Sequence, residues 1–204
     1  MKKSLSILLA LACVVSFSFT SCTKKADGKL KIGIIQLVEH VALDQSYQGF
    51  VDGLKEAGYE DGKNIVIDYQ NAQGEQVNCV TIAEKLVNDR SDLILAIATP
   101  AAQAVANLTT TIPVLVTAVT DPESAKLVKS NAKPETNVSG TSDLTPCAAQ
   151  MDLLKKLVPN AKKVGMLYCS SEQNSHFQIA LAKEACAKAF CAMQMRLKNR
   201  GSLC

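Results

Sequence analysis

The stretch DLILAIATPAAQAVANL, residues 92–108, decides how the rest of the chain folds. Its first seven residues form an apolar run of the length of a buried strand, and a Thr-Pro pair at 99–100 ends that run. An alanine-rich helical pattern follows at once, at residues 101–108. The run IPVLVTAV at 112–119 also ends in a polar, proline-containing corner, Thr-Asp-Pro at 120–122. Two buried strands are therefore predicted to end in polar corners, which is where parallel sheets place ligands.

Strand and helix patterns alternate around these two corners. The strands are predicted at residues 29–38, 63–72, 92–98, 112–119 and 136–142. The helices are predicted at residues 42–59, 75–90 and 101–108. One helical face is predicted to carry Leu43, Tyr47, Phe50, Leu54 and Ala57. Near-continuous apolar strands that alternate with helices are typical of a parallel sheet covered on both faces. We expect an α/β fold, a parallel three-layer sandwich, with a nearly complete first lobe over residues 30–143.

A change of rhythm near residue 144 predicts a second lobe over residues 144–204. The segment TPCAAQMDLLKKLVPNAK begins a helix, with Thr145 as the N-cap and Pro146 in its first turn. A strand that ends in a polar corner is predicted at 162–175, and a helix at 176–189. The remaining FCAMQMRLKNRGSLC breaks the rhythm. We therefore expect a partial second lobe that ends in an irregular tail.

The N-terminus has the pattern of an export signal. A positive start, MKK, precedes an apolar core that is too short to span a membrane, so residues 1–21 are predicted to be a signal peptide. The small residues before Cys22 resemble the lipobox of bacterial lipoproteins, in which the cysteine is acylated, although Phe19 stands where leucine is usual. Residues 22–29 are predicted to be a flexible linker after the acylated cysteine. The alternative is an ordinary secretory signal with a chance cysteine, and both place the mature chain outside the cytoplasmic membrane.

Composition argues against several other classes of protein. The 22 basic residues become 20 once Lys2 and Lys3 leave with the signal, against 19 acidic residues, so no basic surface for nucleic acid is expected. With two histidines and no P-loop, G-x-G-x-x-G or G-x-S-x-G motif, we expect no metal, no cofactor and no enzyme activity. Six cysteines remain after Cys13 and Cys22, and we expect buried thiols rather than disulfides, the disulfide alternative staying open. They are Cys79, Cys147, Cys169, Cys186, Cys191 and Cys204.

Five segments in order carry a resemblance to a known family. They are IGIIQLVEHVALDQSYQGFVDGLKEAGY, LILAIATPAAQAVA, IPVLVTAVTDPESAKLV, NVSGTSD and KKVGMLYCSSEQNS. Together they resemble the substrate-binding lipoproteins of ABC transporters, in the branch that includes tryptophan and tyrosine binders. The resemblance runs from about residue 30 to 189. It implies the periplasmic binding protein-like I fold, in which two α/β lobes enclose a ligand cleft.

The resemblance also implies a function and its partners. A monomer, anchored to the bacterial membrane by lipid and facing the periplasm or the exterior, would capture a small solute, such as an aromatic amino acid. Closure of the lobes would then present the solute to a permease and its ATPase. Family members continue well beyond 204 residues, and the tail does not resemble theirs. We therefore expect a truncated or frame-shifted form in which solute binding is weak or absent.

The polar corners provide the candidate ligand-binding residues. An amino acid carboxylate needs N–H and O–H donors, which the helix beginning at Pro100 or Ala101 and the hydroxyl of Thr99 would supply. The ammonium needs an acceptor, for which Asp121 and Asp143 are candidates. The alternative for Thr99 is plain helix capping, and Asp121 could only cap a short helix.

Other polar residues are predicted to line the same cleft. Thr120 lies in the second corner, and Glu39 and His40 follow the first strand. Ser170 and Asn174 end the first strand of the second lobe, where serine and asparagine are also ordinary turn residues. Beside Glu39 and His40, Asp44 is predicted to cap a helix.

Two other functions use the same fold. A sensory receptor lipoprotein would signal through a partner protein from the same cleft. A secreted α/β enzyme would need acid-base chemistry from Glu39 or His40. Neighbouring genes would separate transport from sensing, since a permease and an ATPase favour the first and a histidine kinase the second.

The lipobox pattern predicts that Cys22→Ser releases the protein from the membrane fraction. The variant should also lose labelling by a fatty-acid analogue, because the thiol is the acylation site. Two or three acyl chains are enough for stable anchoring, whereas a single chain holds only marginally. A parent chain that takes up no lipid label in a bacterial host would contradict the lipoprotein assignment.

Overall fold

A five-stranded parallel sheet forms the larger part of the computed structural model, which describes residues 28–190 and 194–199. Its strands lie in the order β2-β1-β3-β4-β5, and every neighbouring pair is parallel. The strands are β1 (Leu30–Gln36), β2 (Ile65–Asn71), β3 (Leu93–Ile97), β4 (Val114–Val119) and β5 (Val138–Ser142). This is the predicted strand set, with ends that differ by a few residues.

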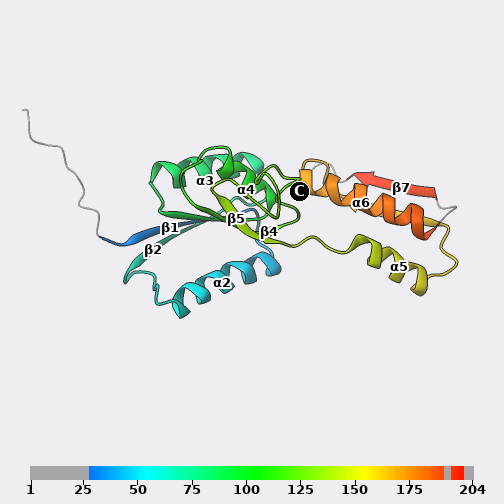
Figure 1. Ribbon diagram of the computed structural model, residues 1–204, viewed down its shortest axis with the longest axis horizontal. Helices are drawn as coiled ribbons and strands as arrows, with labels where there is room; N and C mark the ends of the chain where they lie inside the picture. Colours follow the sequence, from blue (N-terminus) through cyan, green and yellow to red (C-terminus); the bar gives the residue numbers. More distant parts are fainter. Residues whose placement is uncertain (1–27, 191–193, 200–204) are drawn as a thin grey trace, which may run out of the picture.

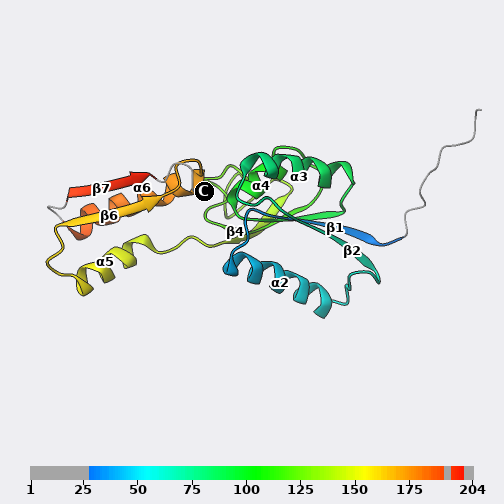
Figure 2. The same ribbon diagram turned by 180° about the vertical axis from the view of Figure 1, so that it is seen from behind.

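Helices cover both faces of this sheet, as the apolar strands predicted. Helix α2 (Val41–Glu56) lies on one face, and α3 (Gln76–Asn88) and α4 (Thr99–Ala106) lie on the other (Figure 1). The view from behind shows the same three layers (Figure 2). Two separate groups of buried apolar side chains fill the spaces between the layers. The three-layer α/β sandwich is therefore confirmed for this part of the chain.

Helix α2 packs through the predicted apolar face. Leu43, Tyr47, Phe50 and Leu54 are partly buried against the sheet, whereas Ala57 is exposed, so its place on the packed face was wrong. Gly58 ends the helix with φ of +86°, and its N–H donates to the Lys55 carbonyl while the Tyr59 N–H donates to the Leu54 carbonyl. This pattern is a Schellman motif, in which a glycine with positive φ commonly ends a helix.

Close approach of β5 to β4 explains a glycine in the edge strand. A Cβ built on Gly140 would lie 2.0 Å from the carbonyl oxygen of Val116, so no other residue fits there. The register shifts between Val116 and Val119, where Ala118 has φ of +53°. This irregularity lies directly before Thr120, which follows β4 at the carboxyl edge of the sheet.

A second, smaller unit follows the extended segment after β5 (Figure 1). It contains α5 (Cys147–Leu157), β6 (Lys163–Tyr168), α6 (Gln173–Ala189) and β7 (Gln194–Asn199). We call residues 30–143 the first lobe and the residues from 144 onward the second lobe. Helices α5 and α6 pack against each other, and β6 pairs with β7 in parallel.

Two details of the second lobe correct the sequence analysis. The tail is not irregular throughout, because residues 194–199 form β7. The alternation Gln-Met-Arg-Leu-Lys at 194–198 is a short period-2 run, which contradicts the prediction of a tail without such a pattern. Pro146 rather than Thr145 occupies the N-cap of α5, and no side chain caps that helix. Two strands still make a marginal sheet, and Leu153, Leu157 and Leu167 remain exposed.

The described cysteines divide into thiols and one disulfide. Cys79, Cys147 and Cys186 are buried and free, as expected, and burial raises the pKa of Cys79 to about 11. Cys169 is disulfide-bonded, which corrects the expectation of a thiol there. Cys22, Cys191 and Cys204 lie outside the described residues, as do the signal peptide and most of the linker. Within the ranges 28–190 and 194–199, none of the helices has the length and apolarity needed to cross a bilayer.

Candidate functional site

The strand-to-helix turn after β3 is strained. Ala98 is the only residue between β3 and α4, and it adopts φ of 84° and ψ of 153°. This region of backbone conformation is populated almost only by glycine, and it costs an alanine about 1–3 kcal/mol. Ala98 is fixed from both sides, because its N–H donates to the Thr117 carbonyl at 3.0 Å and its own carbonyl accepts from Ala102 at 3.0 Å. Such outliers are concentrated at ligand sites.

The turn points the first N–H groups of α4 out of the sheet edge. The first helical hydrogen bond is donated by the Ala102 N–H, so the N–H groups of Thr99 and Ala101 have no acceptor within the helix. Pro100, between them, has no N–H group. The Thr99 side chain is 1% exposed, and its hydroxyl oxygen has no hydrogen-bond partner. Buried hydroxyls almost always have a partner, so this unpartnered group is an exception that needs a physical explanation.

A second unpartnered group lies at the end of the neighbouring strand. Gln36 is fully buried, and its amide Nε2 donates to the Val38 carbonyl at 2.9 Å and to Asp44 Oδ1 at 2.7 Å. Its Oε1 has no partner. Gln36 lies opposite Ile97 in the β1–β3 ladder, and Ile97 precedes Thr99 by two residues. The sequence analysis missed this residue, although a glutamine in the apolar run KLKIGIIQLV was the available signal.

The second lobe contributes a third unpartnered group. Asn174 lies in the first turn of α6, rather than in the predicted strand corner, and its Oδ1 is buried without a partner. Gln178, one turn later on the same helix, donates from Nε2 to the Thr120 hydroxyl at 3.2 Å. Because residues i and i+4 share one helix face, Asn174 also faces the first lobe. Thr120 itself is buried beyond the end of β4.

Asp121 is committed to its own loop. Its Oδ2 accepts from the Ser124 N–H at 2.7 Å, and its Oδ1 accepts from the Asn131 amide at 2.5 Å. Burial raises the pKa of Asp121, but these hydrogen bonds outweigh it and hold the pKa below its ordinary value. The geometry favours the capping role, and a ligand role for Asp121 stays a prediction. Asp143 is exposed where the chain crosses between the lobes, and its N–H donates to the Val119 carbonyl at 3.0 Å.

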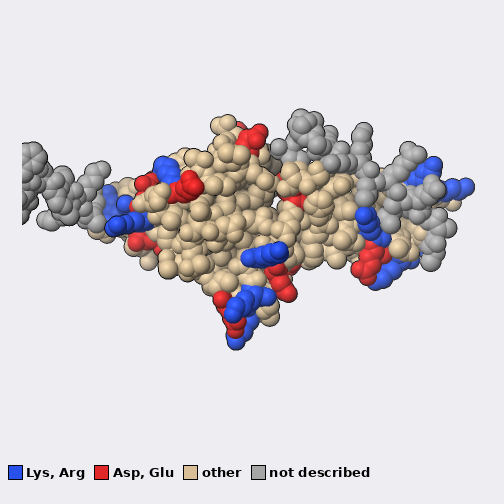
Figure 3. All heavy atoms as spheres, turned by 90° about the horizontal axis from the view of Figure 1, so that it is seen from above, with Lys and Arg blue, Asp and Glu red and all other residues tan. Residues whose placement is uncertain are grey.

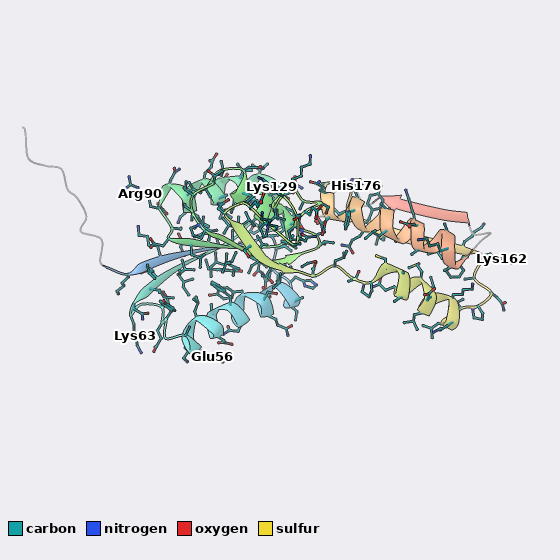
Figure 4. The ribbon with its side chains drawn as sticks, in the orientation of Figure 1. Glu56, Lys63, Arg90, Lys129, Lys162 and His176 are labelled. Carbon is teal, nitrogen blue, oxygen red and sulfur yellow. The ribbon has the colours of Figure 1, made fainter. Side chains whose placement is uncertain are left out.

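The remaining predicted residues lie at the rim. His40 is exposed and caps α2, since its Nδ1 accepts from the Ala42 N–H at 3.2 Å, and Glu39 is exposed beside it. Asp44 is bound to Gln36 instead, so these contacts do not assemble an acid-base group. The Ser170 carbonyl is 2.9 Å from Nε2 of His176, which holds the β6–α6 turn. Figure 4 shows His176 at the end of α6 that faces the first lobe.

Charged side chains are unevenly spread over the molecule. Figure 3 shows Lys, Arg, Asp and Glu side chains at both ends of the face in view and a few near its middle. A surface cavity of about 790 Å³ lies elsewhere, between α4 and the loops that follow β4, and its lining does not include Thr99. Among the described residues, no group of three or more His, Cys, Asp or Glu side chains could hold a metal ion.

Comparison with known proteins identifies the family. The model of the family described as ABC transporter substrate binding protein matches residues 31–195, so the chain belongs to that family. A tyrosine-binding protein from Clostridioides difficile (strain R20291) is 48% identical over 191 residues, which are 87% of this chain and 55% of that protein. The chain thus spans little more than half the length of this relative.

Solved structures give the fold. An ABC domain from Streptococcus pneumonia in complex with L-Trp is 42% identical, with a TM-score of 0.79 over 84% of this chain and 57% of its own. A ligand-free, open substrate-binding protein with adhesive properties from Clostridium difficile is 47% identical, with a TM-score of 0.65 over 85% of this chain and 58% of its own. The type I periplasmic binding protein fold is therefore confirmed. The TM-score is higher for the L-Trp complex, although the ligand-free, open protein is the more identical of the two in sequence.

Strain at Ala98 predicts that Ala98→Gly stabilises the fold. Glycine adopts this conformation freely, so the free energy of unfolding should rise by about 1 kcal/mol. Ala104→Gly is a matched control, because Ala104 is equally buried at 9% exposure but lies in the middle of α4, where glycine should cost about 1 kcal/mol. Urea unfolding measures both variants. Equal destabilisation by the two changes would show that Ala98 is not strained.

Proposed function

We propose that this chain is the solute-binding component of an ABC importer and that it captures an α-amino acid, with aromatic amino acids as the favoured class. Lipid on Cys22 would anchor it outside the cytoplasmic membrane, where it would deliver the amino acid to a permease driven by an ATPase. Family membership supports the transport role. The relatives described as tyrosine-binding and as an L-Trp complex support the aromatic class.

The unpartnered hydroxyl of Thr99 at the start of α4 is the observation that carries the proposal. A carboxylate placed there would accept from this hydroxyl and from the N–H groups of Thr99 and Ala101. The positive end of the α4 dipole would add to the attraction. Charge-assisted hydrogen bonds in a buried site are stronger than neutral ones, so this seat would supply much of the affinity.

The ammonium group needs acceptors, and two buried oxygens are available. Oε1 of Gln36 comes from the first lobe and Oδ1 of Asn174 from the second, and both are without partners. An amino acid that bonded both would link the lobes and stabilise the closed form, with no covalent step. Asp143, at the crossing between lobes, stays a predicted further acceptor.

The competing functions have weaker support. A sensory receptor would bind the same ligand at the same site and differ only in its protein partner. An enzyme would need Glu39 or His40 to act on the ligand, but His40 is engaged in capping and both are exposed. Impaired binding was predicted from a second lobe with one strand. Pairing of β7 with β6 weakens that reason, and the affinity stays to be measured.

Binding can be followed by the fluorescence of L-tryptophan itself, because the chain contains no tryptophan. We expect the processed chain to bind L-tryptophan and L-tyrosine, the latter measured by competition, and to discriminate against aromatic amines that lack the carboxylate. Absence of binding by both amino acids at millimolar concentration would contradict the proposal. A micromolar Kd would instead contradict the predicted impairment.

Thr99→Val directly tests the proposed binding position for the ligand carboxylate. The variant keeps the shape but removes the hydroxyl, so Kd for L-tryptophan should rise about tenfold, which corresponds to about 1.4 kcal/mol. Thr109→Val is the matched control, since the Thr109 hydroxyl is also buried but accepts from the Thr111 and Ile112 N–H groups. The control should lose stability and keep its Kd. An unchanged Kd in Thr99→Val would remove this residue from the site.

A further inference from the structure

Four glutamine side chains join the two lobes directly. Two belong to the first lobe, on α3 and α4, and two belong to α6 of the second lobe. They are Gln76, Gln103, Gln173 and Gln178, and we call them the glutamine latch. Every bond that they make between lobes is donated by a neutral side-chain amide.

Gln173 is the centre of the latch. Its Oε1 accepts from Nε2 of Gln103 at 2.8 Å, and its own Nε2 donates to the Ser124 carbonyl at 2.8 Å. The amide of Gln103 is held in place by a further bond to the Ala125 carbonyl at 3.1 Å. Both ends of one side chain from the second lobe are therefore bound by groups of the first.

The two outer bonds fix the orientation. Gln178 donates to the Thr120 hydroxyl at 3.2 Å, and Gln76 donates to the Ser171 carbonyl at 2.8 Å. The contacts on the first lobe come from three places, namely the start of α3, α4 and the loop after β4. Bonds spread in this way oppose rotation of one lobe on the other, which a single contact would not.

No charge contributes to the latch. Each ion pair of the described residues joins two groups of the same lobe. Neutral amide bonds are little affected by salt, whereas exposed ion pairs are screened. Gln76 and Gln173 are exposed, so each bond adds only modestly to closure, and the sum can hold the lobes near a balance between two states.

We propose that the glutamine latch sets the fraction of molecules whose lobes are closed before any ligand binds, and thereby sets the affinity for the ligand. The claim about the closed fraction stands by itself, and only the claim about affinity rests on the proposed function. The apparent Kd equals the intrinsic Kd divided by the closed fraction, so loss of the latch weakens binding although none of its four side chains needs to touch the ligand. The latch residues are positioning residues in this sense.

The test uses Gln173→Ala and Gln103→Ala, which break the same bridge from opposite lobes. Gln150→Ala is the matched control, because Gln150 is exposed on α5 of the second lobe and makes none of the four hydrogen bonds between the lobes. Small-angle X-ray scattering of the ligand-free processed chain measures the radius of gyration. L-Tryptophan fluorescence measures Kd.

Both latch variants should expand in the absence of ligand. Gln173→Ala should bind about tenfold more weakly because it loses two neutral hydrogen bonds between the lobes, and Gln103→Ala should show a smaller loss because it loses one. The control should match the parent in both measurements, and circular dichroism should show the same helix content in all four proteins. An unchanged radius in both variants would overturn the latch. An increased radius with unchanged Kd would overturn its control of affinity. If the parent binds no amino acid, the proposed function fails, and the scattering still decides whether the latch exists.

Discussion

The direct junction of β3 and α4 is the constraint on which the candidate site depends. A buried strand and a buried helix meet with only Ala98 between them, and the chain accepts an unfavourable backbone conformation at that residue. In return, the first turn of α4 is held at the sheet edge, with free N–H groups and the unpartnered Thr99 hydroxyl turned the same way. Core packing on both sides of the turn, from Ile97 to Val105, keeps it from relaxing.

In the proposed site, uncharged groups would do most of the recognition around this turn. Thr99 and Gln36 are buried and Asn174 is half-buried, each with a buried oxygen that lacks a partner, while both carboxylate oxygens of the nearby Asp121 are hydrogen-bonded within its own loop. Neutral acceptors can be buried in the ligand-free protein at lower cost than a carboxylate. The proposed ligand contacts and the proposed glutamine latch would act on the same equilibrium, because both would form only when the lobes approach.

The apolar runs correctly predicted a parallel sheet and the helices on both of its faces, whereas the role of the corner at Thr99 stays a prediction. The sheet was predictable because burial of a strand on both faces leaves a continuous signal in sequence. Gln36 and the latch could not be predicted in this way, since which side chain reaches across between lobes depends on tertiary arrangement. β7 was missed because its alternation spans only five residues and includes two apolar side chains. The disulfide at Cys169 was missed because a disulfide needs two residues brought together in space.

A crystal structure of the processed chain with L-tryptophan tests the central claim most directly. The account predicts the ligand carboxylate within hydrogen-bond distance of the Thr99 hydroxyl and of the N–H groups of Thr99 and Ala101, with the ammonium near Gln36 and Asn174. A carboxylate bound elsewhere, with the Thr99 hydroxyl still lacking a partner, would contradict it.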